Sequence, residues 1–544
     1  MDDTPAMPPT TESSPLGEQP RSPTSRDFSN WNEIIAHSQR VRWLELLVLL
    51  LLVILSDAAI YQARGYAGPA VYLGMAPLLM ACGAVRRCWN WQTILVLIMV
   101  WGIAGRLLWC GSWLAVAGGF IFLGAVSLSL AGGSVFILEM CRFIAGMFFS
   151  SFCGLLVYER WLRQLLGRWL RVPSLARWLQ FLLPPAVGLV FAVVFILANP
   201  DLARWTTNEI AALIRQVDEW LIALIDSPWR IVFWIASLCV SIGLLRPLLM
   251  SVPVLKERAD ASPPVPAEAP LYPAFRNTLG LLMILFAAYL CFEFWTMWKG
   301  DFPPDFYYAG YAHEGAFWLT VALGLATVLL SLFFRGTMWT DSRLPNLKRL
   351  AFIWSAENLL LAAAVYNRLF IYIHFNGMTR MRVIGMLGTS TVVVGLLLVV
   401  LKILLQRNFA WVIRHQLIAL AVAIYLYAVL PVDAFVVRYD VAHILSGNLK
   451  PSVQIAHHPT SLEGKIMLFP LLECPDPIIR DGIAEMLWQT RQDLDQQTTG
   501  DWTTWQAAAD LFRKMADRNK LHEPRQLPPP GAWQRLRDYS FQWY

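Results

Sequence analysis

About a dozen long apolar stretches, running from near Arg42 to near Pro431, constrain the fold more than any other feature of this chain. Each has roughly twenty residues and few charges, which is the length that a helix needs to cross a hydrocarbon layer of roughly 30 Å. The sequence is 57% hydrophobic and 15% charged, and its mean hydropathy is +0.48. A soluble protein has no core large enough to bury such an excess, so the sequence predicts an all-α, polytopic membrane protein.

The hydropathy pattern predicts a transmembrane helical bundle over residues 42–431 with about 12 spans, within a range of roughly 11 to 13. The spans lie near 42–63, 66–85, 92–110, 113–131, 134–156, 177–198, 229–250, 276–298, 315–335, 350–373, 381–404 and 409–431. Glycine and proline interrupt the second of these, and the fourth is rich in glycine. Either of these two therefore also fits a re-entrant segment.

The segments outside the spans are of three kinds. Residues 1–41 are rich in Pro, Ser and Thr and are expected to form a disordered or interfacial N-terminal arm. Two amphipathic segments, 159–176 and 201–226, are expected to lie as helices in the membrane surface, and the first is basic enough between Arg160 and Arg171 to attract anionic lipids. Residues 432–544 are polar and carry helix signals, which predicts a small, soluble, mostly helical C-terminal domain.

Positive charge is concentrated in alternate loops. The basic loops lie around 160–177, 256–276, 335–349 and 407–414. Because an excess of Lys and Arg marks cytoplasmic loops, the second half of the chain orients consistently. In the first half, Arg42 and Arg87 share that side only if one span fewer, or one more, precedes Glu159. The sequence leaves this parity open.

Charged residues inside the spans carry the only hints of mechanism, because an ionisable group in hydrocarbon costs several kcal/mol unless it is paired or wetted. Glu139 and Arg142 lie one turn apart, which predicts an intramembrane ion pair within one helix. Arg106, Arg246 and Lys402 lie near span ends. Their long side chains can reach the interface there, so we expect no special role for them.

The span at 350–373 is unusually polar for a membrane helix. Its candidate site residues are Glu357, Asn358, Asn367, Arg368, Tyr372 and, just beyond the span, His374. Glu357 and Arg368 are almost three turns apart and share one helix face. The stripe fits either a cavity for a substrate, an ion or a lipid headgroup, or a seam of hydrogen bonds between helices.

Two motifs carry a resemblance to a known family. The segment 366–382 reads YNRLFIYIHFNGMTRMR, in which a helix bearing Arg and Tyr runs into a Gly-x-Thr-x-x-Arg turn, and the segment 308–317 reads YAGYAHEGAF. The motif residues are Tyr308, Tyr311, Gly315, Arg368, Gly377, Thr379 and Arg382. These motifs resemble those of bacterial membrane proteins grouped as domain of unknown function 4173, and of the related group 4153. The resemblance implies a multi-pass protein of the bacterial cytoplasmic membrane with unknown biochemistry.

Signatures of common chemistries are absent from the sequence. There is no G-x-x-x-x-G-K-[ST] loop, no H-E-x-x-H motif, no G-x-S-x-G elbow and no dinucleotide-binding G-x-G-x-x-G. The 8 cysteines follow no disulfide or metal-binding pattern. We therefore expect no metal, no cofactor and no catalytic residue, and the lipid bilayer rather than nucleic acid as the surrounding partner.

Three functions fit these observations. The sequence favours a non-enzymatic membrane sensor or scaffold, with residues 432–544 as a surface for a protein partner. The first alternative is a secondary transporter or channel with a polar site on the 350–373 span. The second is a membrane-embedded enzyme acting on a lipid-linked substrate, with His374, Arg380 and Arg382 near the headgroup.

Overall fold

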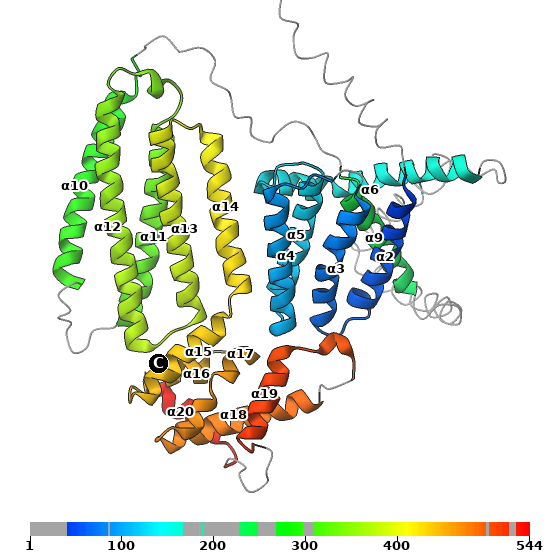
Figure 1. Ribbon diagram of the computed structural model, residues 1–544. Coiled ribbons are helices and arrows are strands. Elements are labelled where there is room, and N and C mark those ends of the chain that lie inside the picture. The colour runs from blue at the N-terminus through cyan, green and yellow to red at the C-terminus, as the bar shows by residue number, and fades with distance from the viewer. Residues whose placement is uncertain are drawn as a thin grey trace, which may run out of the picture.

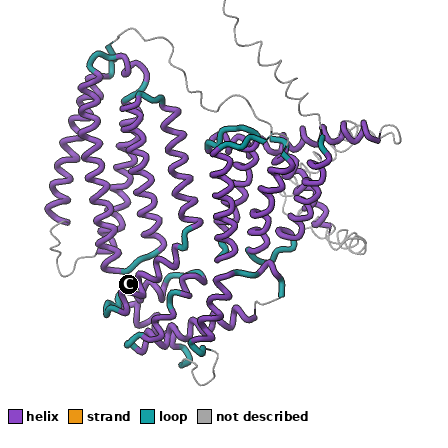
Figure 2. The backbone as a smooth tube through the Cα atoms, in the orientation of Figure 1, coloured by secondary structure: helices purple, strands orange, loops and turns teal. Residues whose placement is uncertain are grey.

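A computed structural model of the chain describes residues 41–84, 87–166, 228–247, 268–297, 308–496, 500–521 and 529–543, together with Pro184 and Gly188. Within these residues every secondary-structure element is a helix. Figure 1 labels the helices, and Figure 2 colours the backbone by secondary structure. The predicted all-α membrane bundle is thereby confirmed.

The helices follow the predicted spans closely. They are α2 (Trp43–Ser56) with the π-helical turn η1 (Asp57–Tyr61), α3 (Ala67–Gly83), α4 (Trp91–Trp109), α5 (Trp113–Leu130), α6 (Ile137–Leu166), α9 (Pro228–Leu245), α10 (Tyr272–Met297), α11 (Tyr308–Phe333), α12 (Leu344–Asn376), α13 (Arg380–Leu405) and α14 (Phe409–Val429). In the described part of the chain, nine helices are long and apolar enough to cross a membrane, and α3 and α9 are shorter apolar helices. The predicted arm 1–41 apart from its last residue, the span 177–198 apart from Pro184 and Gly188, and the surface helix 201–226 lie outside the described residues.

The two segments that also fitted a re-entrant structure are continuous helices. α3 runs through its internal Pro77, and α5 is uninterrupted despite its glycines. Gly119 lets α5 approach α3 closely, since a Cβ at this position would overlap Leu73 of α3.

α6 differs from its prediction as a span followed by a separate surface helix. It is one helix from Ile137 to Leu166, so it includes the predicted span and the described start of the predicted surface helix, and it runs across the ends of neighbouring helices (Figure 1). Glu139 near its start pairs with Arg414 in the second turn of α14, and Tyr158 donates a hydrogen bond to Glu45 in the first turn of α2. These two α6 residues are about 28 Å apart along the helix, yet both meet the same end of the bundle.

This placement of α6 favours one span fewer before Glu159 than the predicted spans give, although Ile137–Leu162 is itself long and apolar enough to cross a membrane. Four described helices, α2 to α5, precede α6, so the chain returns to the end at which it started. The starts of α2, α4, α10 and α14 lie at this end, which we call the basic end (Figure 1). Near these starts in the sequence stand Arg42, Arg87, Arg276 and Arg407. The C-terminal domain lies at the opposite end, which we call the domain end.

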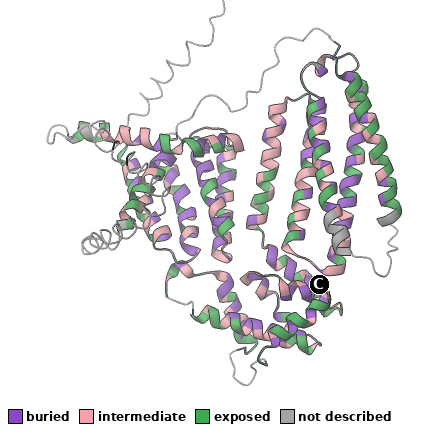
Figure 3. Cartoon of the chain, turned by 180° about the vertical axis from the view of Figure 1, so that it is seen from behind, coloured by how far each residue is buried: buried purple, intermediate pink, exposed green. Residues whose placement is uncertain are grey.

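The membrane helices form two groups (Figure 1). In the first, α2–α5 and α9 enclose a core that includes Leu52 and Val100, and in the second α10–α13 pack around Leu323 and Trp354. α14 packs against α13 and also contacts α4, α5 and α6, so it joins the groups. Exposed side chains lie mostly on outward faces (Figure 3), and many are large and apolar, such as Ile284, as expected for faces in contact with lipid.

α9 is tied to α2 at both ends by ion pairs. At the domain end, Arg230 donates to both carboxylate oxygens of Asp57. At the basic end, Arg246 donates to both carboxylate oxygens of Glu45, which is only 1% exposed. The acids of α2 and of the following turn η1 are therefore each compensated by an arginine at one end of α9.

The polar C-terminal segment is a compact helical unit. It contains α15 (Val432–Leu445), α16 (Ser452–His457), α17 (Leu462–Ile466), η3 (Phe469–Glu473), α18 (Pro477–Gln496), η4 (Trp502–Thr504), α19 (Ala507–Arg518), α20 (Ala532–Ser540) and η6 (Phe541–Trp543). Its core includes Leu471, Ile483 and Phe512, and Cys110 from just after α4 is buried in the same cluster. The domain is thus packed against the membrane helices.

Candidate functional site

Arg368 is the best-coordinated charge among the predicted site residues. Its Nε donates to Oε1 of Glu293 at 2.7 Å, and its Nη2 donates to Oε2 of Glu293 and to the hydroxyl of Tyr289. Glu293 and Tyr289 lie one turn apart on α10, and both charged side chains are at most 4% exposed. Arg368 therefore binds α12 to α10, and its carboxylate partner is Glu293 and not Glu357 on its own helix.

Gly315 makes room for this arginine. A Cβ at this position of α11 would overlap Nη1 of Arg368. Gly315 and Arg368 belong to the two separate family motifs, and the structure brings them into direct proximity. Tyr308 and Tyr311 lie in the first turns of α11, where the backbone is helical and the side chains are outside the described residues.

The rest of the polar stripe on α12 does not converge on Arg368. Asn358 is fully buried and its Nδ2 donates to the carbonyl oxygen of Trp354, while its Oδ1 has no hydrogen-bond partner among the described residues. Glu357 is half-buried, and its Oε2 likewise finds no partner in the described part of the chain. Asn367 is half-buried and His374 is exposed.

The Gly-x-Thr-x-x-Arg motif forms the turn 377–382 between α12 and α13, which we call the junction turn. Gly377 has φ +83° and ψ −170°, a conformation open essentially to glycine alone. Thr379 caps α13, with its Oγ1 accepting the N–H of Arg382. Arg382 in turn donates to the carbonyl oxygen of Gly377, and its Cζ lies 3.8 Å from the ring centroid of Tyr372. Each motif residue thus has a role in the shape of this turn.

The junction turn is bound to the C-terminal domain. Met378 donates its N–H to Oδ1 of Asp440 on α15 at 2.6 Å, and Gln454 of α16 donates to the carbonyl oxygen of Asn376 at 2.8 Å. Arg380 forms a two-fold ion pair with Asp433, which also accepts the N–H of Ser461. The turn that the resemblance singled out is therefore the contact between the second helix group and the domain.

Two further contacts hold the domain against the first helix group. Arg106, near the end of α4, donates to both oxygens of Glu463 at 2.7 Å, and the Glu463 side chain is 2% exposed. Between α2 and α3, the N–H of Arg64 donates to Oγ1 of Thr503 at 3.0 Å. The backbones approach closely here, because a Cβ on the neighbouring Gly65 would lie 2.6 Å from the carbonyl oxygen of Thr503.

Several charged residues form buried contacts that the sequence did not indicate. Arg106 and Arg246, which we expected only to reach the interface, are engaged in buried ion pairs, and Lys402 is buried and donates to the carbonyl oxygen of Ser331. Glu139 forms an ion pair with Arg414 of α14, a partner from another helix that the sequence did not indicate. Sequence periodicity relates residues within one helix, so it missed these partners from other helices.

Asp440 is a titratable group that the C-terminal domain buries. It is 1% exposed, and its Oδ2 has no hydrogen-bond partner among the described residues. Burial raises the pKa of its carboxyl from 3.8 to about 8, against the opposing effects of the Met378 N–H and of Arg382. Near neutral pH the folded protein therefore holds this carboxyl mostly protonated, whereas the unfolded chain ionises it.

We expect the attachment of α15 to weaken as pH rises. Between about pH 4 and pH 8 the folded state keeps a proton on Asp440 that the unfolded chain has released. The free energy of unfolding therefore decreases as pH rises through this range, and the contribution of Asp440 is complete only below it. Hydrogen exchange of α15 amides, corrected for intrinsic rates, should show protection decreasing from pH 5.5 to 8.5. The Asp440→Asn variant should flatten this profile, and an equally steep profile in that variant would exclude Asp440 as its source.

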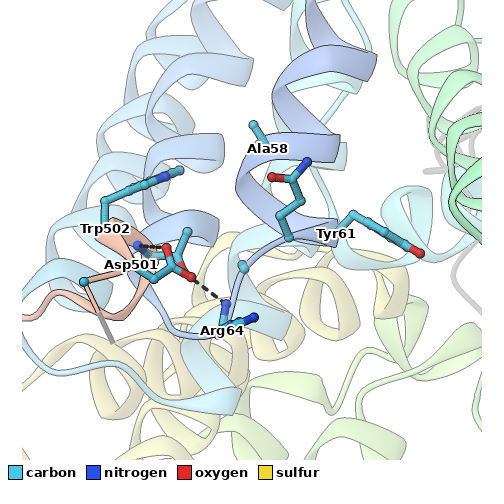
Figure 4. A pocket seen from close by; sticks show the side chains of 9 residues that line it. Ala58, Tyr61, Arg64, Asp501 and Trp502 are labelled. Carbon is cyan, nitrogen blue, oxygen red and sulfur yellow. Dashed lines mark hydrogen bonds between the residues drawn. The ribbon is translucent and has the colours of Figure 1, made fainter. Parts of the chain in front are cut away.

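An open hollow of about 660 Å³ lies where η4 meets η1 and the residues that follow it. One side is formed by Ala58 and residues 61–64 and the other by residues 500–503; Figure 4 shows Trp502, Asp501, Tyr61 and Arg64 around it. In the described residues no three His, Cys, Asp or Glu side chains are placed to hold a metal ion.

One comparison with known proteins gives a match. A family model described as "Domain of unknown function (DUF4153)" matches residues 73–457. The matched region runs from within α3 to the end of α16, so it includes Arg368, the junction turn and Asp440, and excludes Glu463 and η4. No curated protein and no solved structure matches the chain.

Proposed function

The chain belongs to the DUF4153 family, and from its contacts we propose that it is a non-enzymatic membrane sensor or scaffold whose C-terminal domain follows the arrangement of its membrane helices. The observation that carries this proposal is the attachment of one domain to both helix groups. Arg106 with Glu463 holds the first group, and Arg380 with Asp433 holds the second. A shift between the groups would strain one of these contacts, so the domain is suited to report such a shift.

The charge distribution supports an assignment of the C-terminal domain to one side of the membrane. Arg42, Arg87, Arg276 and Arg407 belong to the basic end by their positions next to helix starts, and an excess of positive charge favours the cytoplasmic side. We therefore propose that the domain faces away from the cytoplasm, in the bacterial cytoplasmic membrane that the resemblance to group 4173 implies. A reporter enzyme that folds only outside the cytoplasm should be active when fused after Tyr544. Activity of a cytoplasm-dependent reporter there would reverse the assignment.

The proposal includes two binding partners, a protein and anionic lipids. The exposed surface of the C-terminal domain would bind a protein partner, because the domain is held in a fixed position beside the membrane. Anionic lipids would gather at the basic side of the α6 segment Arg160–Leu166, which lies across the basic end at the level of the headgroups.

The function is tested by separating the domain from the helices without removing either. In cells lacking the gene, the double variant Asp433→Asn with Glu463→Gln should fail to restore the wild-type phenotype while its abundance in the membrane is unchanged. A single exposed change on the same domain, Arg480→Gln, serves as the control and should restore it fully. Full restoration by a chain that ends at Pro431 would contradict the proposal.

A transporter or channel is the second candidate, and one observation favours it. Glu357 and Asn358 each have a buried oxygen without a hydrogen-bond partner among the described residues, in the middle of a membrane helix. Such groups mark ion or proton pathways in membrane proteins. Under this alternative Glu357→Gln should abolish activity, whereas a sensor or scaffold should tolerate it.

The enzyme alternative receives less support. His374, Arg380 and Arg382 do lie at one interface with Asp433 and Asp440. Both arginines, however, are already engaged, one by Asp433 and the other by the Gly377 carbonyl and the Tyr372 ring. Their geometry serves the junction turn, and a substrate would have to displace these contacts.

A further inference from the structure

The hollow between the α2–α3 connection and η4 lies at the end of a membrane-spanning stretch. The membrane-spanning stretch that begins at Trp43 ends at Tyr61, and Gln62, Ala63 and Arg64 follow immediately. Tyr61 and Trp502 flank the hollow, and aromatic side chains of this kind prefer the boundary between hydrocarbon and water. A phospholipid beside α2 would therefore present its headgroup at the mouth of this hollow.

The hollow carries one charge of each sign. Arg64 is exposed, and its backbone is fixed by the hydrogen bond from its N–H to Thr503. Asp501 accepts the N–H of Thr503 at 2.9 Å, which together with the charge of Arg64 holds the pKa of its carboxyl below the usual value, so it is ionised at neutral pH. The two charges come from opposite sides of the hollow and are close enough to interact.

We propose that this hollow binds the headgroup of a zwitterionic phospholipid with a primary ammonium group, of the phosphatidylethanolamine type. Arg64 matches the phosphodiester, because guanidinium groups bind phosphate oxygens with paired donors. Asp501 matches the ammonium, which donates hydrogen bonds that a quaternary choline lacks. The inference needs the chain to lie in a bilayer but does not depend on a sensor role.

The test measures lipid retention by the purified full-length protein. Delipidated protein in mild detergent is titrated with equimolar phosphatidylethanolamine, phosphatidylcholine and phosphatidylglycerol, and bound lipids are counted by native mass spectrometry. The wild type should retain phosphatidylethanolamine several-fold over the other two. Arg64→Ala should lose this retention, and Arg438→Ala, an exposed arginine on α15 at the same end, should keep it.

Asp501→Asn separates recognition of the ammonium from folding of the loop. An asparagine side-chain oxygen can still accept the Thr503 N–H, so η4 keeps its cap while the charge is lost. The variant should bind phosphatidylethanolamine and phosphatidylglycerol about equally. Equal retention of all three lipids by the wild type would overturn the proposal, and so would a phosphatidylglycerol preference that Arg64→Ala removes, since that result indicates an anionic lipid instead.

Discussion

Replacing Arg368 with alanine should lower the free energy of unfolding by about 3–5 kcal/mol, the cost of leaving a buried carboxylate without its partner. Glu293 is 1% exposed and loses two charge-assisted hydrogen bonds in this variant. Titration with sodium dodecyl sulfate in detergent micelles, followed by circular dichroism, measures the change. Arg276→Ala is the control, because this exposed arginine lies on the same partner helix, α10, and should change stability by less than about 0.5 kcal/mol.

Gly315→Ala provides an independent route to the same defect. Its new methyl group would overlap Nη1 of Arg368 and displace the guanidinium from Glu293 without removing any charge. Gly324→Ala is the matched control, since it lies on the same helix with no atom within 4 Å of the added Cβ. Equal stability of these two alanine variants would show that Arg368 is not confined as described.

Gly377→Ala should release the C-terminal domain from the junction turn. Two effects add: the positive φ of +83° is strained for alanine by about 1–3 kcal/mol, and the Cβ would lie 2.6 Å from Oδ1 of Asp440 and 2.9 Å from Cβ of Pro451. The domain should then become sensitive to protease at α15 and α16, while the membrane helices stay protected. The rate of cleavage in detergent, compared with wild type, measures this release.

A control variant at Gly447 distinguishes backbone strain from steric overlap with Asp440 and Pro451. It has φ +97° at the end of α15, with no atom within 4 Å of an added Cβ. Gly447→Ala therefore carries the conformational penalty alone and should be cleaved more slowly than Gly377→Ala. If the two variants behaved alike, the contact with Asp440 would have no part in holding the domain.

The helices were predictable from the sequence because each span satisfies its own backbone hydrogen bonds and needs only length and apolarity. The ends of α12, α13 and α14 fall within a few residues of their predicted limits, apart from an early start of α12 at Leu344. The cap at Thr379 and the glycine conformation at Gly377 are also local features, so the motif indicated a turn before its partners were known.

The pairing of charges could not be predicted in the same way. Arg368 meets Glu293 of α10, and Glu463 meets Arg106 of α4, across separations of 75 and 357 residues. Which helix lies beside which is decided by packing of whole groups, and periodicity within one helix holds no information about it. Asp440 was missed for a related reason: a carboxylate in a polar domain is usually exposed, and only the fold buries this one.

The two ion pairs between α2 and α9 bear on how the chain is made. Glu45 and Asp57 leave the ribosome 201 and 173 residues ahead of Arg246 and Arg230. At a synthesis rate of about 5–20 residues per second, their arginines follow roughly 10–40 s later. During that interval the first membrane helix has two carboxylates and neither arginine, so these acids must be kept in contact with water or with the insertion machinery. The ion pairs that hold α2 against α9 can therefore form only after translation has passed α9.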